Sequence, residues 1–373
     1  MKMLKRILKW ITGAILVLLL LAFVVVFIAY WRSTNDCGHT AAPANPMKAI
    51  VYCDYGVANL KLQEIEKPAP ADDQVLVKIR ATSVNPYDWH FIEGTPKIMR
   101  LGVGLRKPKS TRLGVDYAGT VEAVGKNVTQ FKPSDEVFGG RDGAFAQYVC
   151  VRQDRLIALK PANITFDEAG SVDIAGVTAL QAVRDKAKVQ PGQKVLINGA
   201  SGGVGTFAVQ IAKSLGAEVT GVCSTRNVDL VRSLGADHVI DYTKEDFTKS
   251  DQRYDVIIDN VASRTLSECR RVLTPNGKYV LIGGGSGAKD WHGLFGPMTR
   301  AFRIMLTKRF VSQEMGMMLT DPKQKDLTDL ADLMQSGKVK PVIDRSYKLS
   351  DVSAAVAYVE EGHARGKVVI EVE

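Results

Sequence analysis

A glycine-rich segment, residues 198–205 (NGASGGVG), offers the clearest chemistry in the sequence. The residues before it form a short apolar run typical of a buried strand, and those after it carry apolar side chains at helical spacing. A strand, a glycine turn and a helix in this order let the main chain approach a diphosphate at a helix N-terminus. A plain tight turn is the alternative interpretation. The residues expected at the diphosphate are Ser201, Gly202, Gly203, Val204 and Gly205.

The residues after the next expected strand indicate which dinucleotide this turn would bind. In dinucleotide-binding folds, an acidic residue about 20 positions past the first glycine usually holds the ribose hydroxyls of NAD. Here the strand is followed by residues 223–227 (CSTRN), which contain no carboxylate. Ser224, Arg226 and Asn227 could contact a 2′-phosphate, and Tyr242, after the third strand, could join that pocket. NADPH is therefore favoured over NADH, with a solvent-exposed helix-start role for Arg226 as the alternative.

Two patterns of elements would position these residues. Residues 47–165 form a succession of short strands and turns, which predicts a compact β-rich domain. A helical segment at 167–187 is followed by strands that alternate with helices, which predicts a parallel sheet covered on both faces. The chain ends in a further strand-like segment at 366–372 (GKVVIEV). The strands of the parallel sheet are expected at 194–198, 218–222, 237–240, 254–259 and 278–283.

The N-terminal segment is expected to be a membrane anchor. Residues 11–30 contain no charged side chain, and a helix of that length, at about 1.5 Å per residue, crosses a hydrocarbon core of about 30 Å. Trp10, Tyr30 and Trp31 flank it, as amphipathic rings do at membrane interfaces. The alternative is a cleaved signal peptide, whose apolar region is usually about 7–15 residues long.

Length, charge and cysteine usage narrow the class of protein. The 373 residues are enough for two domains, and the net charge of +9 forms no basic stripe with interleaved aromatic residues, so no nucleic acid is expected as a partner. No C-x-x-C pair occurs, which predicts free thiols, suited to a reducing compartment, rather than a disulfide framework or a zinc site. The five cysteines are Cys37, Cys53, Cys150, Cys223 and Cys269.

Two segments of the β-rich region resemble a known family. Residues 114–125 (GVDYAGTVEAVG) resemble the G-x-D-x-A-G-x-V-x-x-V-G signature of the medium-chain dehydrogenase/reductases, and residues 80–88 (RATSVNPYD) resemble the matching loop of their quinone oxidoreductase branch. Residues 176–182 (GVTALQA), the glycine turn and the closing strand extend the resemblance over residues 47–373. It implies an α/β protein with a GroES-like β-rich catalytic domain and a Rossmann dinucleotide-binding domain, here preceded by a single transmembrane helix.

The resemblance also implies a domain organisation, with a homodimer as the expected assembly. The expected parts are an N-terminal membrane anchor at 1–31, a linker at 32–46, a GroES-like catalytic domain at 47–165, a Rossmann NADP-binding domain at 166–310 and a C-terminal return to the catalytic domain at 311–373.

Departures from the zinc-bearing members of the family bear on the chemistry. Those members carry a cysteine ligand where this chain has Asn85, and a G-H-E motif where it has Gly114, Val115 and Asp116. Because valine cannot coordinate zinc, no catalytic metal is expected. The implied reaction is hydride transfer from NADPH to an acceptor that is already polarised, a quinone or an α,β-unsaturated carbonyl.

The resemblance assigns residues on the nicotinamide side of the cleft. Asn85 and Asp88 are expected to line it, and Thr178, Gly283 and Lys367 to help hold the cofactor.

The local candidates for a catalytic proton donor are Tyr87, Asp88 and His90, with a helix cap for Asp88 and ordinary cleft walls for the other two as alternatives. A membrane-tethered NADPH-binding sensor or interaction protein without turnover is the alternative function.

The side of the membrane on which the catalytic domain lies is subject to opposing arguments. Lys2, Lys5, Arg6 and Lys9 precede the apolar segment, which predicts a cytoplasmic N-terminus with the remainder on the far side. NADPH is principally a cytoplasmic reductant, and unpaired thiols also point to the cytoplasm. We expect a cytoplasmic catalytic domain, against the charge rule.

Residues 294–310 (LFGPMTRAFRIMLTKRF) combine apolar and basic side chains at helical spacing. Such a segment could lie on an anionic membrane surface. A lid or a subunit-contact helix beside the cleft is the preferred interpretation.

Overall fold

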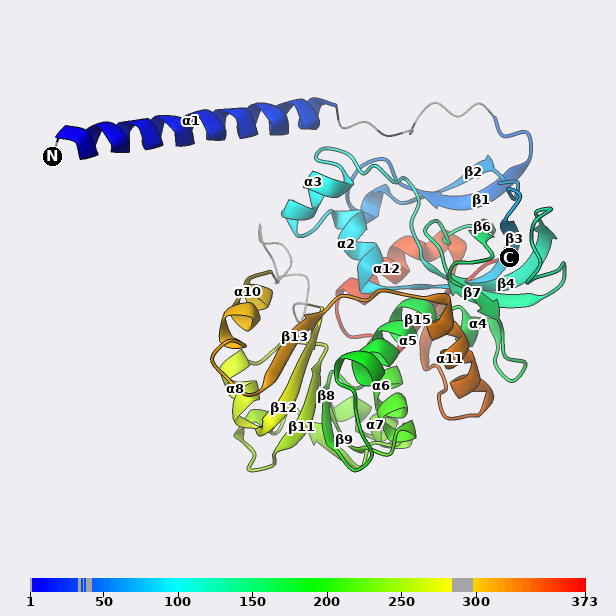
Figure 1. Ribbon diagram of the computed structural model, residues 1–373. Helices are drawn as coiled ribbons and strands as arrows, with labels where there is room; N and C mark the ends of the chain where they lie inside the picture. Colours follow the sequence, from blue (N-terminus) through cyan, green and yellow to red (C-terminus); the bar gives the residue numbers. More distant parts are fainter. Residues whose placement is uncertain (1, 33–34, 36, 38–41, 284–297) are drawn as a thin grey trace.

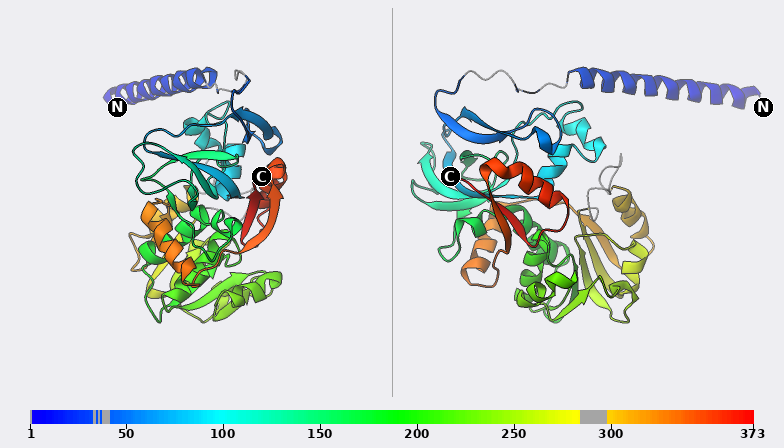
Figure 2. Two further views of the ribbon diagram at one scale, coloured as in Figure 1. Left: turned by 90° about the vertical axis from the view of Figure 1, so that its right-hand side faces the viewer. Right: turned by 180° about the vertical axis from the view of Figure 1, so that it is seen from behind.

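The computed structural model describes residues 2–32, 35, 37, 42–283 and 298–373 (Figure 1). A long N-terminal helix precedes two lobes, one built on a seven-stranded sheet with a separate hairpin and the other on a six-stranded sheet. The C-terminus returns to the lobe that the chain forms first (Figure 2).

Helix α1 (Lys2–Trp31) contains the apolar segment. Its portion Lys9–Trp31 has a mean hydropathy of 3.2, and none of it is buried against the rest of the protein. By length and composition this is a helix that could cross a membrane, although a signal sequence has the same features.

The GroES-like lobe is formed by a β1–β2 hairpin and a seven-stranded sheet in the order β14-β15-β3-β4-β5-β7, with β6 paired to β3. Its central strand β3 alternates buried and exposed residues at its centre and is buried at its end, where it reaches the other lobe. The strands are β1 (Pro46–Val51), β2 (Lys61–Glu66), β3 (Gln74–Val84), β4 (Asp116–Val124), β5 (Glu136–Gly140), β6 (Tyr148–Arg152), β7 (Ile157–Leu159), β14 (Ile343–Lys348) and β15 (Lys367–Glu371). The helices are α2 (Pro86–Glu93), α3 (Arg100–Val103) and α12 (Val352–Glu360), with 3₁₀ turns η1 (Val57–Asn59), η2 (Lys97–Met99) and η6 (Leu349–Asp351).

The Rossmann lobe is a six-stranded parallel sheet in the order β10-β9-β8-β11-β12-β13. This is the 3-2-1-4-5-6 order of dinucleotide-binding folds, in which the ligand lies at the carboxyl ends of the strands. The strands are β8 (Lys194–Asn198), β9 (Glu218–Cys223), β10 (His238–Asp241), β11 (Tyr254–Asp259), β12 (Leu273–Ile282) and β13 (Glu314–Met318). The helices are α4 (Phe166–Ala169), α5 (Asp173–Leu180), α6 (Gly203–Ser214), α7 (Val228–Ser233), α8 (Leu266–Arg271), α10 (Met298–Thr307) and α11 (Gln324–Gln335), with η4 (Thr225–Asn227) and η5 (Phe247–Lys249).

The five predicted strands of the parallel sheet are confirmed, but the expected boundary at residue 310 is wrong. Strand β13 pairs in parallel with β12, from Lys278 opposite Glu314 to Ile282 opposite Met318. The Rossmann sheet therefore continues beyond residue 310. The return to the catalytic lobe is completed later, where β15 pairs with β3.

The helix predicted at 167–187 is divided into three parts. Helix α4 ends before Gly170, where a Cβ atom would lie 2.7 Å from the carbonyl oxygen of Ala81 on β3. Helix α5 follows and then continues as a π-helical turn, η3 (Gln181–Lys186). The close approach of the main chain to β3 explains the break, which helical periodicity alone does not reveal.

The prediction that all cysteines are free thiols is wrong. Cys37 and Cys53 form a disulfide with a Cα–Cα distance of 5.6 Å, whereas Cys150, Cys223 and Cys269 are free. Two described residues before β1 contact the loop after it: Cys37 through the disulfide, and Asn35, whose side chain donates a hydrogen bond of 2.7 Å to the carbonyl oxygen of Cys53.

Candidate active site

The glycine turn between β8 and α6 has the geometry that a diphosphate requires. A Cβ atom on Gly205 would lie 2.0 Å from the carbonyl oxygen of Gly199, so α6 packs directly on the turn. On Gly202 the nearest atom would be 3.6 Å away, and on Gly203 it would be 3.3 Å away. A Cβ atom on Gly202, the N-cap of α6, would thus meet only ordinary contacts, whereas Gly203 lies close to the Lys367 side chain. The amide groups in the first turn of a helix favour an anion.

The segment after β9 is joined to this turn by one side chain. The Asn227 amide donates hydrogen bonds to the hydroxyl oxygens of Ser201 (3.0 Å) and Ser224 (3.2 Å). Its own carbonyl oxygen Oδ1 is buried and has no hydrogen-bond partner among the described residues. A buried acceptor of this kind and the open glycines fit a dinucleotide with its ribose and phosphate groups at this edge.

Arg226 and Tyr242 lie at the outer edge of the same region. The Arg226 guanidinium donates a hydrogen bond of 2.5 Å to the carbonyl oxygen of His363, and Tyr242 is 53% exposed. A carboxylate that the sequence analysis did not consider lies nearby, because Asp241 accepts a hydrogen bond of 2.6 Å from Thr225. Hydrogen bonds from Thr225 and Thr243 hold the pKa of Asp241 below its usual range.

Where β3, β4 and β15 meet lies a buried polar cluster that includes Asn85, which was expected to line the nicotinamide side of the cleft. The Lys367 ammonium contacts the side-chain oxygen of Asn85 and forms an ion pair of 3.1 Å with Asp116. Asn85, Asp116 and Lys367 are each at most 3% exposed. The Asp116 carboxylate also accepts hydrogen bonds from Ser83 Oγ, Asn85 Nδ2 and the Ile174 amide, at 2.6, 3.1 and 3.0 Å. Lys367 and Asp116 thus fix the orientation of the Asn85 amide.

Asp88 and Tyr87 occupy the first turn of α2, directly after Asn85. The two oxygens of Asp88 accept hydrogen bonds from the backbone amides of Asn85 (2.7 Å) and Gly114 (3.2 Å). Burial raises the pKa of Asp88 to about 7, and burial and the nearby Asp142 raise the pKa of Tyr87 to about 12. Tyr87 is half-buried and protonated at neutral pH, whereas Asp88 supports the turn from inside. Burial lowers the pKa of His90 to about 3, so that this side chain is neutral.

Two residues near this cluster, Asp173 and Thr320, have no signal in the sequence. Asp173 at the start of α5 is 2% exposed, and a Cβ atom on Gly140 would lie 1.9 Å from its Oδ2. Burial and the adjacent Asp116 raise its pKa well above the usual value. The hydroxyls of Thr178 and Thr320 lie 2.8 Å apart. These contacts join segments far apart in the sequence, so local patterns do not reveal them.

The glycine turn of the Rossmann lobe and the Asn85–Asp116–Lys367 cluster are connected by hydrogen bonds across the two lobes. The Gly366 amide donates a hydrogen bond of 2.8 Å to the carbonyl oxygen of Ser201, and Gly202 and Gly366 form a β-bridge. Since Lys367 follows Gly366 directly, the diphosphate turn adjoins the Asn85 cluster. Gly283, directly after β12, has a positive φ of 71°, and the residues after it up to 297 lie outside the described part of the chain.

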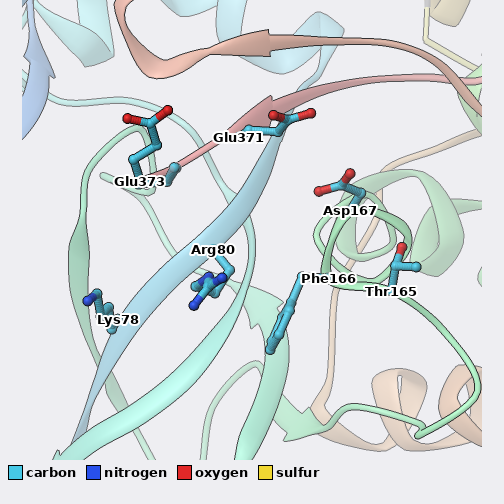
Figure 3. Close-up of a pocket in the computed structure, with 8 residues that line it drawn as sticks. Lys78, Arg80, Thr165, Phe166, Asp167, Glu371 and Glu373 are labelled. Carbon is cyan, nitrogen blue, oxygen red and sulfur yellow. The ribbon is translucent and has the colours of Figure 1, made fainter.

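A surface pocket of about 550 Å³ lies elsewhere, between β3, α4 and the end of β15 (Figure 3). Lys78 and Arg80 line it opposite Asp167, Glu371 and Glu373. None of its lining residues belongs to the candidate site, so it is a separate feature.

Comparisons with known proteins agree with the two lobes. Residues 71–162 match the family described as alcohol dehydrogenase GroES-like domain, and residues 234–370 match the family described as zinc-binding dehydrogenase. A chloroplastic quinone-oxidoreductase from Triphysaria versicolor is 34% identical over 352 residues, covering 87% of this chain and 98% of that protein. A chloroplastic NADPH-dependent alkenal/one oxidoreductase from Arabidopsis thaliana is 34% identical, covering 87% of this chain and 79% of that protein. The quinone oxidoreductase structure from Coxiella burnetii has 30% identity and a TM-score of 0.76, with 88% and 100% of the two chains covered.

These relatives match over both lobes, and the protein is an oxidoreductase of the medium-chain dehydrogenase/reductase class that uses a nicotinamide cofactor. Within that class the chain belongs to the zinc-independent quinone oxidoreductase family, as residues 80–88 and 114–125 predicted. Although one matching family is named for zinc, the described residues contain no cluster of three or more His, Cys, Asp or Glu side chains that could hold a metal ion.

Proposed function

We propose that this protein transfers a hydride from NADPH to a quinone or an α,β-unsaturated carbonyl, without a metal, and that α1 anchors it in a membrane. The observation that carries the proposal is the junction at Gly366, where the open glycine turn adjoins the buried Asn85–Asp116–Lys367 cluster. A dinucleotide whose diphosphate occupies the turn would have its nicotinamide directed toward that cluster.

The chain's own residues would bind and orient the reactants. Ser201, Gly202, Gly203, Val204 and Gly205 would hold the diphosphate, while Thr178, Gly283 and the ordered Asn85 amide would position the nicotinamide end. The cofactor supplies the hydride when bound. The hydroxyl of Tyr87 is the group in α2 that could donate a proton to a reduced acceptor, because it is protonated at neutral pH and only half-buried. Asp88 would act by holding the turn that carries Tyr87.

The preference for NADPH rests on Ser224 and Arg226, which could contact a 2′-phosphate once Arg226 leaves the His363 carbonyl. The Arabidopsis relative named as NADPH-dependent supports this choice. Asp241 opposes it, since a nearby carboxylate repels a phosphate. The Lys244 ammonium lies 3.2 Å from the Asp241 carboxylate and partly offsets this repulsion.

The test uses the full chain in detergent, titrated with NADPH and with NADH, followed by absorbance at 340 nm after addition of 1,4-benzoquinone or an enone. We expect tighter binding of NADPH and acceptor-dependent oxidation. Arg226→Ala should weaken NADPH binding about tenfold or more and leave NADH binding unchanged. Binding of NADPH without oxidation by any acceptor would contradict the enzymatic proposal and favour the sensor function, which no feature of the site supports at present.

The orientation of the anchored domain is part of the proposal. The expected cytoplasmic position rested on the supply of NADPH and on unpaired thiols, and the second argument fails for Cys37 and Cys53. Disulfides persist mainly in oxidising compartments, and the lysines and arginine before the apolar segment favour a cytoplasmic N-terminus. The disulfide and the basic residues before the apolar segment therefore favour the same orientation. We propose that the catalytic domain lies on the side of the membrane opposite the cytoplasm, where it would require its own supply of nicotinamide cofactor.

A further inference from the structure

We propose that the Cys37–Cys53 disulfide holds the side of the molecule that carries α2 and α3 against the membrane, so that the preferred acceptors are long-chain quinones or enones dissolved in the lipid. The inference rests on the proposed function and on the membrane-spanning role of α1.

The disulfide is attached to a loop that supports the catalytic helix. In this loop, residues 52–57, the Gly56 amide donates a hydrogen bond of 2.8 Å to the carbonyl oxygen of Ile92 in α2. The Val57 amide donates one of 3.0 Å to Glu93 at the end of the same helix. These hydrogen bonds connect Cys53 to α2, the helix that carries Tyr87, so the disulfide also fixes the position of α2 relative to the linker.

The same loop also packs on α3 and the residues after it. The Arg100 guanidinium lies 4.1 Å from the centre of the Tyr55 ring, and Lys107 lies 3.6 Å from the Asp54 carboxylate. The loop, α2 and α3 thus form one unit, and the disulfide joins this unit to the linker.

The position of the disulfide shortens the tether, the segment of chain that joins α1 to the catalytic lobes. Without the bond, the chain between Trp31 and the start of β1 at Pro46 could extend over about 50 Å. With the bond, the path from Trp31 to Cys37 can extend over only about 20 Å. Cys53, which belongs to the loop that contacts α2 and α3, can then lie no farther from the end of α1 than about that distance plus the 5.6 Å between the two Cα atoms of the disulfide.

The part of the molecule next to this unit has the surface that an anionic membrane would bind. Two segments, one from each lobe, lie at the same end of the molecule in both ribbon views (Figures 1 and 2): residues 97–112 with α3, and residues 298–310 with α10. Neither contains an acidic residue. We call these two segments together the basic face. Its basic residues are Lys97, Arg100, Arg106, Lys107, Lys109, Arg112, Arg300, Arg303, Lys308 and Arg309.

The basic face also exposes large apolar side chains. Leu101, Phe302, Met305 and Leu306 are between 47% and 56% exposed, and Phe310 is 85% exposed. Apolar side chains interspersed with cations are typical of segments that lie in the headgroup region of anionic membranes. The membrane is the occupant indicated here, because a short covalent tether to a membrane span brings it to this face. Residues 294–297 of the segment considered from the sequence lie outside the described part of the chain.

A substrate class follows from this placement. An acceptor with a long apolar tail is concentrated in the lipid, and a site held at the lipid surface encounters it at a high effective concentration. A small water-soluble quinone gains nothing from the tether, so the two kinds of acceptor should respond differently when the disulfide is removed.

The experiment compares the full-length protein, reconstituted in vesicles of phosphatidylcholine and phosphatidylglycerol, with two acceptors. One is ubiquinone-10 in the bilayer and the other is 1,4-benzoquinone in the buffer. Cys37→Ser should lower the rate of NADPH oxidation with ubiquinone-10 about fivefold or more and change the rate with 1,4-benzoquinone less than twofold. Cys150→Ser, which removes a free and partly exposed thiol, is the matched control and should change neither rate.

Reduction of the wild-type disulfide with dithiothreitol should reproduce the effect of Cys37→Ser, and reoxidation should reverse it. Arg303→Glu combined with Arg309→Glu should also lower the ubiquinone-10 rate selectively. Equal rates before and after loss of the disulfide would overturn the proposal, as would a parallel loss with both acceptors, which would show a purely structural bond. Failure of the wild type with 1,4-benzoquinone would instead contradict the proposed function itself.

Discussion

At the scale of single residues, the site depends on one buried ion pair. The Asp116 carboxylate accepts four hydrogen bonds, one of them from Lys367. A buried charge without its partner is strongly destabilising. The pair therefore supports the Asn85 amide only as long as both members are present.

We expect Lys367→Met to lower the free energy of unfolding by about 3–5 kcal/mol, because it leaves the Asp116 carboxylate buried without a cation. Urea unfolding followed by circular dichroism measures the change. Lys348→Met, at an exposed position with a distant carboxylate, is the control and should stay within about 0.5 kcal/mol of the wild type. A Lys367→Met protein as stable as the control would contradict the stabilising role of the ion pair between Lys367 and Asp116.

The role proposed for Tyr87 can be separated from that of its neighbours. Tyr87→Phe keeps the ring contact with Phe91, whose centre lies 4.3 Å away, and removes only the hydroxyl. An enone must be protonated on carbon, whereas a reduced quinone can take its protons from water. We therefore expect kcat/KM for an enone to fall about 100-fold and that for 1,4-benzoquinone to fall less than threefold. A similar fall for both acceptors would argue for a binding role.

Asp88 makes stability depend on pH. Its pKa is raised from 3.8 to about 7, so between these values the folded chain keeps a proton that the unfolded chain has lost. This contribution is fully present below about pH 4 and is lost as the pH rises through about 7. The stability advantage of the wild type over Asp88→Asn should therefore shrink by about 2–4 kcal/mol between pH 4.5 and 7.5. Urea midpoints at these pH values provide the measurement, and a constant difference would contradict the raised pKa.

At the scale of elements, two glycines of the same turn have different tasks. A Cβ atom on Gly205 would collide with the Gly199 carbonyl at 2.0 Å, whereas on Gly202 the same oxygen would be 3.6 Å away. One glycine permits helix packing, and the other leaves room for a ligand.

This difference predicts opposite outcomes for two alanine substitutions. Gly205→Ala should lower the free energy of unfolding by about 1–3 kcal/mol or more, because backbone atoms must move. Gly202→Ala should leave stability within about 1 kcal/mol and weaken NADPH binding instead. Thermal unfolding and fluorescence titration of NADPH distinguish the two, and equal destabilisation by both would contradict the assigned geometry.

The sequence predicts the elements that follow simple periodicity and misses those that depend on distant contacts. Strands β8, β9 and β11 are buried on both faces, so they are predicted from continuous apolar runs in the sequence. Strand β13 (EMGMM) lacks β-branched residues and was not expected in the sheet. The glycine turn and Asn85 were identified, but Asp173 and Thr320 were not, because they reach the site only through the packing of segments far apart in the sequence. The pairing of Cys37 with Cys53 has no spacing signal either.

At the scale of the whole molecule, the proposed orientation can be tested by labelling. In a Cys150→Ser background, a cysteine introduced at the exposed Lys325 should react with a membrane-impermeant maleimide from the side opposite the cytoplasm in intact cells. A cysteine in place of Met3, which is 76% exposed, should react only after the cytoplasm is opened. The reverse pattern would place the catalytic domain in the cytoplasm.

The disulfide also determines which fragments are released when a protease cleaves the linker. Cys37 and Cys53 enclose a covalent ring that contains the remainder of the linker and all of β1. A protease that cuts once between residues 38 and 45 opens this ring but leaves the two fragments joined through their sulfur atoms. With α1 anchored in a membrane as proposed, the catalytic lobes should sediment with the membrane fraction after such a cut and be released only when a thiol reagent is added. Cleavage between Trp31 and Cys37 releases them at once, so the two positions of cleavage are distinguishable on a non-reducing gel.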